Sequence, residues 1–318
     1  MSTLKYTSDI LKNDFQQLVI PLDNDYEGRV IATLVRHQSN AFSNKSALYI
    51  HGFNDYFFQK ELAYKFSEYG INFYALDLRK YGRSFLPHQK FNDIRSLKAY
   101  FEEIDKAIEI IHNEGNSKIT LIGHSTGGLI VTLFAKYHIN KNYFDGIILN
   151  SPFFEFNVNP IQKVLIPMAS SLGKFFPQIK ITGGFSEKYG ESIHKNYSGE
   201  WEYDLNLKPN LAPKINLGWL RAIYRAQQEM KNKVYIDKPI LILYSSKSVT
   251  NLNDSSQVAT MDSILNVKHI ERISENIIGD KEIKAIDGGL HDLVLSRKDV
   301  RKEVYQSIFE WMKKKNLA

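Results

Sequence analysis

Short apolar runs alternate with longer amphipathic segments through the first half of this chain. The amphipathic segments 59–69, 93–114 and 129–137 predict helices, because their apolar residues recur at helical spacing. The apolar runs predict strands, at residues 15–22, 29–36, 46–50, 71–78, 118–122 and 144–150. Strands that stay apolar along their length and alternate with helices are typical of a parallel sheet covered on both faces. The pattern therefore predicts an α/β fold.

The alternation stops after residue 152. Residues 153–237 contain several glycines and prolines and many aromatic residues, and they show no convincing strand–helix alternation. Beyond them the pattern predicts two more strands and a closing helix, at residues 238–244, 282–286 and 300–314. We therefore expect a core made of residues 1–152 and 238–318, with residues 153–237 inserted as a cap over the sheet.

Composition narrows the class of protein and its partners. A chain of 318 residues with 43% hydrophobic content can bury a large core, and the absence of cysteine excludes disulfides and cysteine-based chemistry. The net charge is +6, but basic and acidic residues are intermixed except at residues 313–315, which we interpret as a helix end. We expect no nucleic-acid partner, while a mildly basic surface suits anionic lipid headgroups or acidic substrates.

The sequence contains no motif for metal, phosphate or dinucleotide binding. The histidines show no H-x-x-x-H pair, and there is no glycine-rich phosphate or dinucleotide loop, so we expect neither a metal nor a cofactor. The first residues lack the layout of a signal peptide, and no apolar run approaches the roughly 20 residues of a membrane span. We expect a cytoplasmic protein.

The strongest chemical signal is Ser125 in the sequence G-H-S-T-G, which directly follows an apolar strand and precedes a helix. A serine on such a sharp turn needs small neighbours, which Gly123 and Gly127 supply, and the turn raises the hydroxyl above the edge of the sheet. The plain alternative is a glycine-rich turn with an incidental serine. We interpret Ser125 as a nucleophile.

A serine nucleophile needs a base and an acid that orients the base. His291 lies in a glycine-containing loop after the last predicted strand, where the base is expected if the order is serine, acid, histidine. No carboxylate directly follows the strand that ends near Tyr244, so the acid must come later. We favour Asp262, which precedes an apolar stretch, over Asp254, whose polar surroundings are typical of a loop or a helix cap.

The oxyanion that forms during acyl transfer needs two N–H donors directed at one point. Thr126 follows the nucleophile and supplies the first donor, and Phe53 supplies the second from the His-Gly turn after an early strand. We expect His51 and His124 to hold these loops by hydrogen bonds rather than to transfer protons.

With these residues identified, the chain resembles the α/β-hydrolase superfamily. It is most similar to the serine aminopeptidase-like branch, which includes monoacylglycerol lipases and bacterial lysophospholipases. The matching pieces are H-G-F, D-L-R-K-Y-G-R-S, G-H-S-T-G-G and G-L-H-D, at residues 51–53, 77–84, 123–128 and 289–292. The resemblance implies an α/β-hydrolase fold with Ser125 as nucleophile, His291 as base, and Phe53 and Thr126 as oxyanion donors.

The chain departs from the family pattern in three places. The residues S-S-K-S at 245–248 stand where the family has G-x-x-D, and D-S-I-L at 262–265 resembles the displaced acid-bearing element. Lys80 replaces the glycine of the family's D-x-R-G loop, and the segment after His51-Gly52 is less polar than in monoacylglycerol lipases.

Three functional hypotheses follow from these residues. The first is a serine hydrolase that cleaves carboxylic esters, such as lysophospholipid or monoacylglycerol, and contacts a lipid surface transiently. The second is an aminopeptidase, which needs an acidic group for the substrate ammonium, with Glu155, Glu187 or Glu191 as candidates. The third is a non-catalytic ligand-binding protein on a hydrolase scaffold, against which the intact serine and histidine argue. Apolar cap residues at 164–169 and 172–177 suit either an acyl chain or simple packing.

Overall fold

A nine-stranded sheet forms the centre of the part that the computed structural model describes, residues 5–39, 43–183 and 186–318. The signal-peptide expectation rests partly on residues 1–4, which lie outside the described residues. In spatial order the strands are β1 (Thr7–Ser8), β2 (Gln16–Pro21), β3 (Ile31–His37), β5 (Asn72–Asp77), β4 (Lys45–Ile50), β6 (Lys118–His124), β7 (Gly146–Asn150), β11 (Ile240–Ser245) and β13 (Lys281–Ile286).

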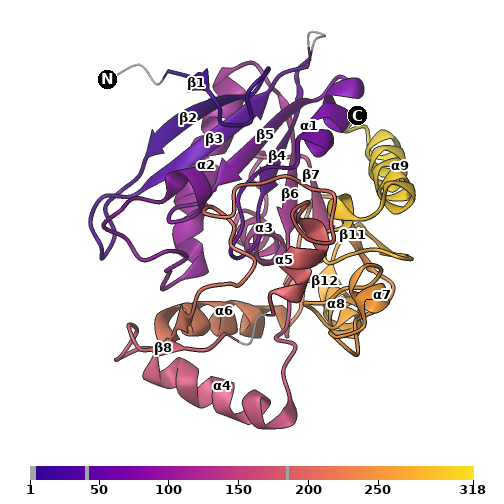
Figure 1. The fold of residues 1–318 in the computed structure, drawn as a ribbon. Coiled ribbons are helices and arrows are strands. Elements are labelled where there is room, and N and C mark those ends of the chain that lie inside the picture. The colour runs from indigo at the N-terminus through magenta and orange to yellow at the C-terminus, as the bar shows by residue number, and fades with distance from the viewer. Residues whose placement is uncertain (1–4, 40–42, 184–185) are drawn as a thin grey trace.

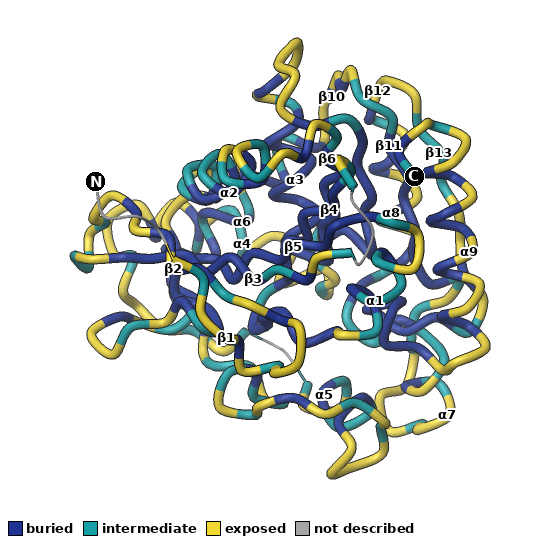
Figure 2. The backbone as a smooth tube through the Cα atoms, turned by 90° about the horizontal axis from the view of Figure 1, so that it is seen from above, coloured by how far each residue is buried: buried dark blue, intermediate teal, exposed yellow. Residues whose placement is uncertain are grey.

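The sheet is mostly parallel. Strands β5, β4, β6, β7, β11 and β13 pair in parallel, while β1, β2 and β3 add an antiparallel edge. Every residue of β5, β7 and β11 is buried, as expected for strands covered on both faces. Figure 2 shows the buried positions concentrated along the central strands and the exposed ones on the outer loops. The predicted α/β fold is confirmed.

Helices cover both faces of the sheet (Figure 1). On one face lie α1 (Lys60–Glu68) and α9 (Lys298–Lys314), which meet where the rings of Phe66 and Phe309 approach to 5.0 Å. On the other face lie α2 (Phe101–Asn113), α3 (Thr126–Tyr137) and α8 (Val267–Ser274). Short 3₁₀ helices span Gly82–Ser84, Leu97–Tyr100 and Leu293–Leu295.

The helix expected over residues 93–114 starts later than its apolar pattern indicates. The Ser96 side chain accepts a hydrogen bond from Lys98 N and caps the 3₁₀ helix that precedes α2. Upstream, the Asp93 carboxylate accepts a hydrogen bond from the side chain of Asn216 at 2.6 Å. The apolar residue Ile94 is still buried, but it belongs to a loop held by this long-range contact.

We call residues 153–237 the cap segment. Its elements are α4 (Pro160–Leu172), β8 (Lys180–Ile181), α5 (Lys188–Ile193), β9 (Ile215–Asn216), α6 (Leu217–Met230) and β10 (Val234–Tyr235). Helices α4 and α6 pack side by side and form a layer with β8 away from the main sheet (Figure 1). The remaining elements, α7 (Ser255–Val258) and β12 (Ile277–Ile278), lie in the loops between β11 and β13. Among the described helices, none is long and apolar enough to cross a membrane.

Candidate active site

Ser125 stands on the turn between β6 and α3, with φ 53° and ψ −116°. This backbone conformation costs free energy for a residue with a side chain, and crowded surroundings hold it in place. A Cβ atom on Gly123 would lie 2.6 Å from the Gly127 carbonyl oxygen, and one on Gly127 would lie 2.2 Å from the Ile50 carbonyl oxygen. Both glycines are therefore required by the close approach of the strand, the turn and the helix.

The structure brings Ser125, His291 and Asp262 into one hydrogen-bonded chain. His291 Nε2 lies 3.0 Å from Ser125 Oγ, and His291 Nδ1 lies 2.9 Å from Asp262 Oδ2. All three residues are at most 7% exposed. With Nδ1–H donated to the carboxylate, Nε2 is left as the acceptor that faces the serine hydroxyl. This arrangement fits a general base next to a nucleophile.

Asp262 reaches His291 through a detour of the chain. After β11 ends at Ser245, the backbone leaves the sheet, forms α7 and returns, so that Ser248 and Asp262 form a β-bridge. Asp262 Oδ1 accepts hydrogen bonds from the backbone N–H groups of Ile264 and Leu265, both at 2.8 Å. These bonds leave Oδ2 directed at His291.

Asp254, the alternative acid, lies within the same detour but serves another purpose. Its carboxylate is the N-cap of α7 and accepts hydrogen bonds from the backbone N–H groups of Ser256 and Gln257. These bonds lower the pKa of Asp254, with the hydrogen bond from the Ser256 side chain as the largest cause. The partners of Asp254 are thus local, whereas His291 is bonded to Asp262.

The residues predicted as oxyanion donors flank Ser125. Gly52 lies so close that a Cβ atom on it would be 3.0 Å from Ser125 Cβ, and Phe53 follows directly. Thr126 opens α3, where the first N–H groups of a helix have no partner within the helix. Phe53 and Thr126 both line the cavity that contains Ser125.

His51 fixes the loop that carries Phe53. Its Nδ1 lies 2.7 Å from the Gly52 carbonyl oxygen, and its Nε2 accepts a hydrogen bond from the backbone N–H of Leu78 at 3.0 Å. Burial lowers the pKa of His51, so the imidazole is neutral and keeps the acceptor nitrogen that Leu78 needs. His124 likewise has a pKa lowered by burial and contacts the Asn150 carbonyl oxygen.

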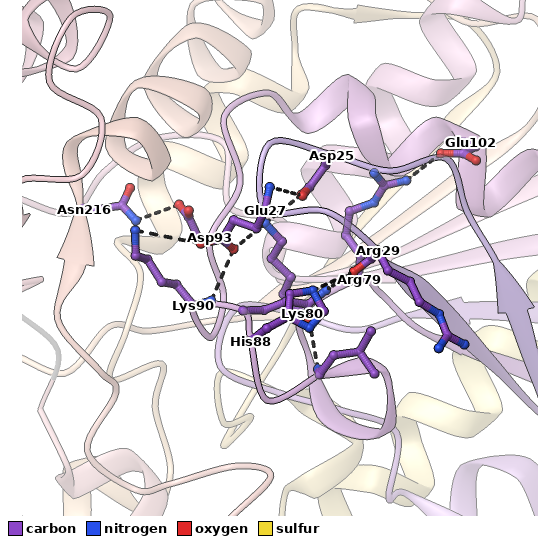
Figure 3. Close-up of polar contacts among 12 residues, drawn as sticks. Asp25, Glu27, Arg29, Arg79, Lys80, His88, Lys90, Asp93, Glu102 and Asn216 are labelled. Carbon is purple, nitrogen blue, oxygen red and sulfur yellow. Dashed lines mark hydrogen bonds and ion pairs between the residues drawn. The ribbon is translucent and has the colours of Figure 1, made fainter.

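Lys80, which replaces a family glycine, is completely buried and has φ 66°, a conformation that favours glycine. Its ammonium lies 2.7 Å from the Asp25 carboxylate, 2.8 Å from the Glu27 carboxylate and 4.1 Å from the centre of the Tyr26 ring. Figure 3 shows Lys80 reaching this turn before β3. The lysine therefore joins the loop after β5 to the turn at residues 25–28.

A cavity of about 300 Å³ contains Ser125 and His291 and is closed largely by the cap segment. Its apolar lining includes Phe156, Leu165, Ile166, Ala169, Ile181, Trp219 and Leu220. The Trp219 ring packs on the Phe53 ring at 4.6 Å, so the cap segment directly contacts the loop that carries Phe53.

Three buried groups beside the site come close enough to share a ligand. One ligand atom each from Asp55, His124 and Asp292 lies within 4.8 Å of the others. Protein groups already bond them: Asp292 accepts from the side chains of Asn150 and Gln59, and Asp55 accepts from its neighbour's backbone N–H. Asp55 is also paired with the Lys208 ammonium, so hydrogen bonds and this ion pair account for both carboxylates.

Sequence reasoning missed two cap residues at this site. Tyr189 packs its ring against His291 at 5.7 Å and accepts a hydrogen bond from the backbone N–H of Asp292. Lys208 pairs with Asp55 inside the cavity. Both come from a segment with irregular patterning, where nothing local indicates which side chains face Ser125.

Comparison with known proteins assigns the family. The sequence profile of the serine aminopeptidase S33 family matches residues 43–298. The chain belongs to this family. It is an α/β-hydrolase of the branch that is similar to monoglyceride lipases.

Individual relatives agree with this assignment. A monoglyceride lipase homologue from monkeypox virus is 23% identical to this α/β-hydrolase over 253 residues, or 79% of this chain and 83% of the relative. The solved structure of a soluble variant of the Saccharomyces cerevisiae monoglyceride lipase superposes with a TM-score of 0.68 at 19% identity, covering 93% of this chain and 96% of that chain. The Paleococcus ferrophilus monoacylglycerol lipase gives 0.64 at 19% identity, covering 90% and 99%.

Proposed function

We propose that this α/β-hydrolase cleaves carboxylic esters of single long acyl chains through an acyl-enzyme on Ser125. The observation that carries the proposal is a buried series of two hydrogen bonds, from Ser125 Oγ to His291 at 3.0 Å and from His291 to Asp262 at 2.9 Å. Ser125 and His291 line a largely apolar cavity. Such a series of hydrogen bonds activates a hydroxyl that is a weak nucleophile on its own. An apolar cavity favours an acyl chain because it removes apolar surface from water.

The proposed reaction has two halves. Ser125 Oγ attacks the ester carbonyl carbon while His291 Nε2 takes the hydroxyl proton, and the N–H groups of Phe53 and Thr126 bind the oxyanion. The C–O bond to the alcohol then breaks, and His291 returns the proton to the leaving oxygen. Water, deprotonated by His291, attacks the acyl carbon of the acyl-enzyme. The bond from that carbon to Ser125 Oγ then breaks, His291 returns the proton to Oγ, and the carboxylic acid leaves. Asp262 holds the imidazole in place and stabilises its positive charge in both halves.

The relatives support a lipid substrate. Two of the matched structures are monoglyceride or monoacylglycerol lipases, and a viral relative is a monoglyceride lipase homologue. Monoacylglycerol and lysophospholipid both combine one acyl chain with a polar headgroup. The proposed substrate is an ester of this kind.

Aminopeptidase activity is the alternative within the same family. It needs a free carboxylate at the site for the substrate ammonium, yet Glu155, Glu187 and Glu191 are absent from the lining of the cavity as far as the structure describes it. Asp55 does line the cavity, but its carboxylate is paired with Lys208. The lining therefore favours an ester over a peptide with a free amino terminus.

The test compares p-nitrophenyl acyl esters with an aminoacyl anilide, for the wild-type protein and Ser125→Ala. We expect turnover of the esters, a loss of at least 10³-fold in kcat in the variant, and no turnover of the anilide. Turnover that survives in Ser125→Ala, or activity on the anilide alone, would exclude the proposal. A series of acyl chain lengths in the same assay measures the depth of the cavity.

The outer surface of the cap supports contact with a lipid surface. Helix α4 and the residues after it leave large apolar side chains exposed, namely Ile161, Val164, Leu165, Met168, Leu172, Phe175, Phe176 and Ile179. Lys163, Lys174 and Lys180 belong to the same stretch and suit anionic headgroups. We propose that α4 rests on a phospholipid surface and receives the substrate from it.

A further inference from the structure

Asn150 ends β7 directly beside the turn that carries Ser125. Its backbone carbonyl oxygen accepts a hydrogen bond from the backbone N–H of Ser125 at 3.0 Å, and His124 Nδ1 lies 3.2 Å from the same oxygen. The ring of His124 in turn packs against the ring of His291 at 4.9 Å. The main chain of Asn150 therefore holds the turn on which Ser125 stands.

The side chain of Asn150 reaches the other half of the site. Its Nδ2 donates a hydrogen bond to Asp292 Oδ1 at 2.6 Å, and its Oδ1 accepts one from the backbone N–H of Leu293 at 3.2 Å. Asp292 and Leu293 directly follow His291 in the chain. Asn150 and Asp292 are 5% and 1% exposed, so water does not compete for these bonds. Asn150 thus bonds to the Ser125 turn and to the His291 loop at once.

Asp292 is also fixed from its other side. Its Oδ2 accepts a hydrogen bond from Gln59 Nε2 at 3.1 Å, and Gln59 is completely buried just before α1. Its Oδ1 also accepts from the backbone N–H of Val294 at 3.3 Å, so that Asp292 caps the 3₁₀ helix that follows. Hydrogen bonds to a carboxylate are stronger than those between neutral groups. The loop that carries His291 is therefore held between β7 and α1.

The approach of His291 to Ser125 depends on this loop. The two residues are 166 positions apart in the chain, and the 3.0 Å contact between them joins segments that the main sheet does not pair directly. Asp262 bonds to the far side of the imidazole and fixes its rotation, whereas the backbone behind the imidazole is held through Asp292. A displacement of about 1 Å between reacting groups can lower a rate by about 10²-fold.

We infer that the Asn150–Asp292 pair positions His291 against Ser125 for acyl transfer. The inference rests on the proposed ester hydrolysis and adds two positioning residues to it. Neither Asn150 nor Asp292 is among the described residues that line the cavity, so neither meets the substrate. The pair should therefore act on the rate of acyl transfer and leave the binding of the ester unchanged.

The first variant is Asn150→Ala, which removes the link to the His291 loop and keeps the carbonyl oxygen that holds the Ser125 turn. With p-nitrophenyl butyrate we expect kcat to fall about 10- to 100-fold while KM stays within about twofold of wild type. This division between kcat and KM distinguishes positioning of the reacting groups from a change in the cavity.

Asn116→Ala is the matched control for general destabilisation. Asn116 is also a buried asparagine, and its side chain bonds to the side chains of Asn72 and Tyr74. It precedes the start of β6, whereas Ser125 follows the end of that strand. We expect Asn116→Ala to lower the free energy of unfolding in urea and to keep the wild-type kcat. An equal fall of kcat in Asn116→Ala and Asn150→Ala would overturn the inference, because lost stability alone would then explain it.

An exchange of the two side chains tests the hydrogen bond itself. Asn150→Asp alone places two carboxylates against each other and should be at least as slow as Asn150→Ala. Asn150→Asp combined with Asp292→Asn again pairs one amide with one carboxylate of nearly the same shape, so kcat should return to within about threefold of wild type.

The outcomes separate the inference from the proposed function. Wild-type kcat in Asn150→Ala, or an exchange variant as slow as Asn150→Asp, overturns the inference alone. A wild-type protein that does not cleave the ester, or Ser125→Ala that still does, overturns the proposed function as well.

Discussion

At the scale of single residues, the site depends on a carboxylate that reaches His291 from a returning loop rather than from the end of a strand. The Ser248–Asp262 bridge brings the returning backbone beside the segment that follows β11. Two backbone N–H groups then fix the carboxylate. The chain therefore leaves the sheet after Ser245 and still places the Asp262 carboxylate against His291.

Asp262→Asn should lower kcat for an acyl ester by about 10³-fold or more, because an amide cannot hold His291 in the same tautomer or stabilise its charge. Asp254→Asn is the matched control from the same loop, since asparagine caps a helix about as well as aspartate. We expect the control to keep wild-type kcat and stability. A large loss of kcat in Asp254→Asn with an active Asp262→Asn would assign the acid to the other residue.

Lys80 is a buried cation that joins the loop after β5 to the turn at residues 25–28. Lys80→Met should lower the free energy of unfolding by about 3 kcal/mol, because it leaves the carboxylates of Asp25 and Glu27 without their buried partner. Adding Asp25→Asn and Glu27→Gln should restore part of that loss. Urea unfolding of the wild-type protein, Lys80→Met and the triple variant measures these free energies.

Lys65→Met serves as the comparison for Lys80. Lys65 pairs with Glu68 on the surface, where the two side chains are 36% and 56% exposed, so its removal should cost under about 0.5 kcal/mol. Equal losses for Lys65→Met and Lys80→Met would show that burial does not set the value of the Lys80 contacts.

At the scale of elements, the loop between β4 and α1 is positioned by its own first residue. His51 accepts a hydrogen bond from Leu78 N–H only while its Nε2 carries no proton. The loop that carries Phe53 is thereby tied to the loop after β5, and both depend on a neutral histidine. This dependence makes the position of Phe53, the proposed oxyanion donor, sensitive to pH.

Burial lowers the pKa of His51 below its ordinary value of 6.5, so below that pH the unfolded chain binds more protons than the folded one. The stabilising contribution is therefore complete above pH 6.5 and is lost as the pH falls through the folded pKa. We expect His51→Gln, which keeps one donor and one acceptor, to reduce the loss of unfolding free energy between pH 7 and 5. The difference is at most about 1.4 kcal/mol per pH unit.

Urea unfolding at several pH values measures this slope. His88→Gln, at an exposed position, should leave the slope of the wild-type protein unchanged. If His51→Gln and wild type lose stability in parallel as the pH falls, the neutral imidazole of His51 is not what the acid removes.

At the scale of the whole molecule, the sequence predicts the central sheet better than the cap segment. Strands buried on both faces are mostly apolar, so the apolar runs within β5, β7 and β11 are visible in the sequence. The turn at Ser125 is also visible, since its glycines are imposed by contacts between adjacent segments. These features are local, or depend only on the sheet.

The elements of the cap segment cannot be predicted in the same way, because its apolar side chains lie partly at the surface and partly in the interior. Helix α4 exposes an apolar face, so the usual separation of apolar interior from polar surface does not mark it as a helix. Its start is defined instead by the side chain of Asn159 and by Gln162, which bond to each other's backbone. The start of the helix over residues 93–114 was wrong for a related reason, because Asp93 is held by Asn216 from far along the chain.

The exposed face of α4 is where the molecule as a whole should meet its substrate. Val164 and Met168 are 68% and 61% exposed and lie one helical turn apart, while the partly buried Ile166 and Ala169 of the same helix line the cavity. Replacing Val164 and Met168 together by glutamate should lower the fraction of protein that sediments with phosphatidylglycerol-containing vesicles by about tenfold or more. The reason is that apolar burial and charge attraction are both reduced.

Val19→Glu provides the control for this experiment. Val19 is 44% exposed on β2 of the main sheet and does not belong to the cap segment. Its replacement should therefore leave vesicle binding at the wild-type level. Circular dichroism of each variant shows that the helices are retained. Because the same helix presents one face to the lipid and another to the cavity, loss of binding should raise KM for vesicle-borne ester more than for a water-soluble one. Equal sedimentation of all three proteins would mean that α4 does not rest on the lipid surface.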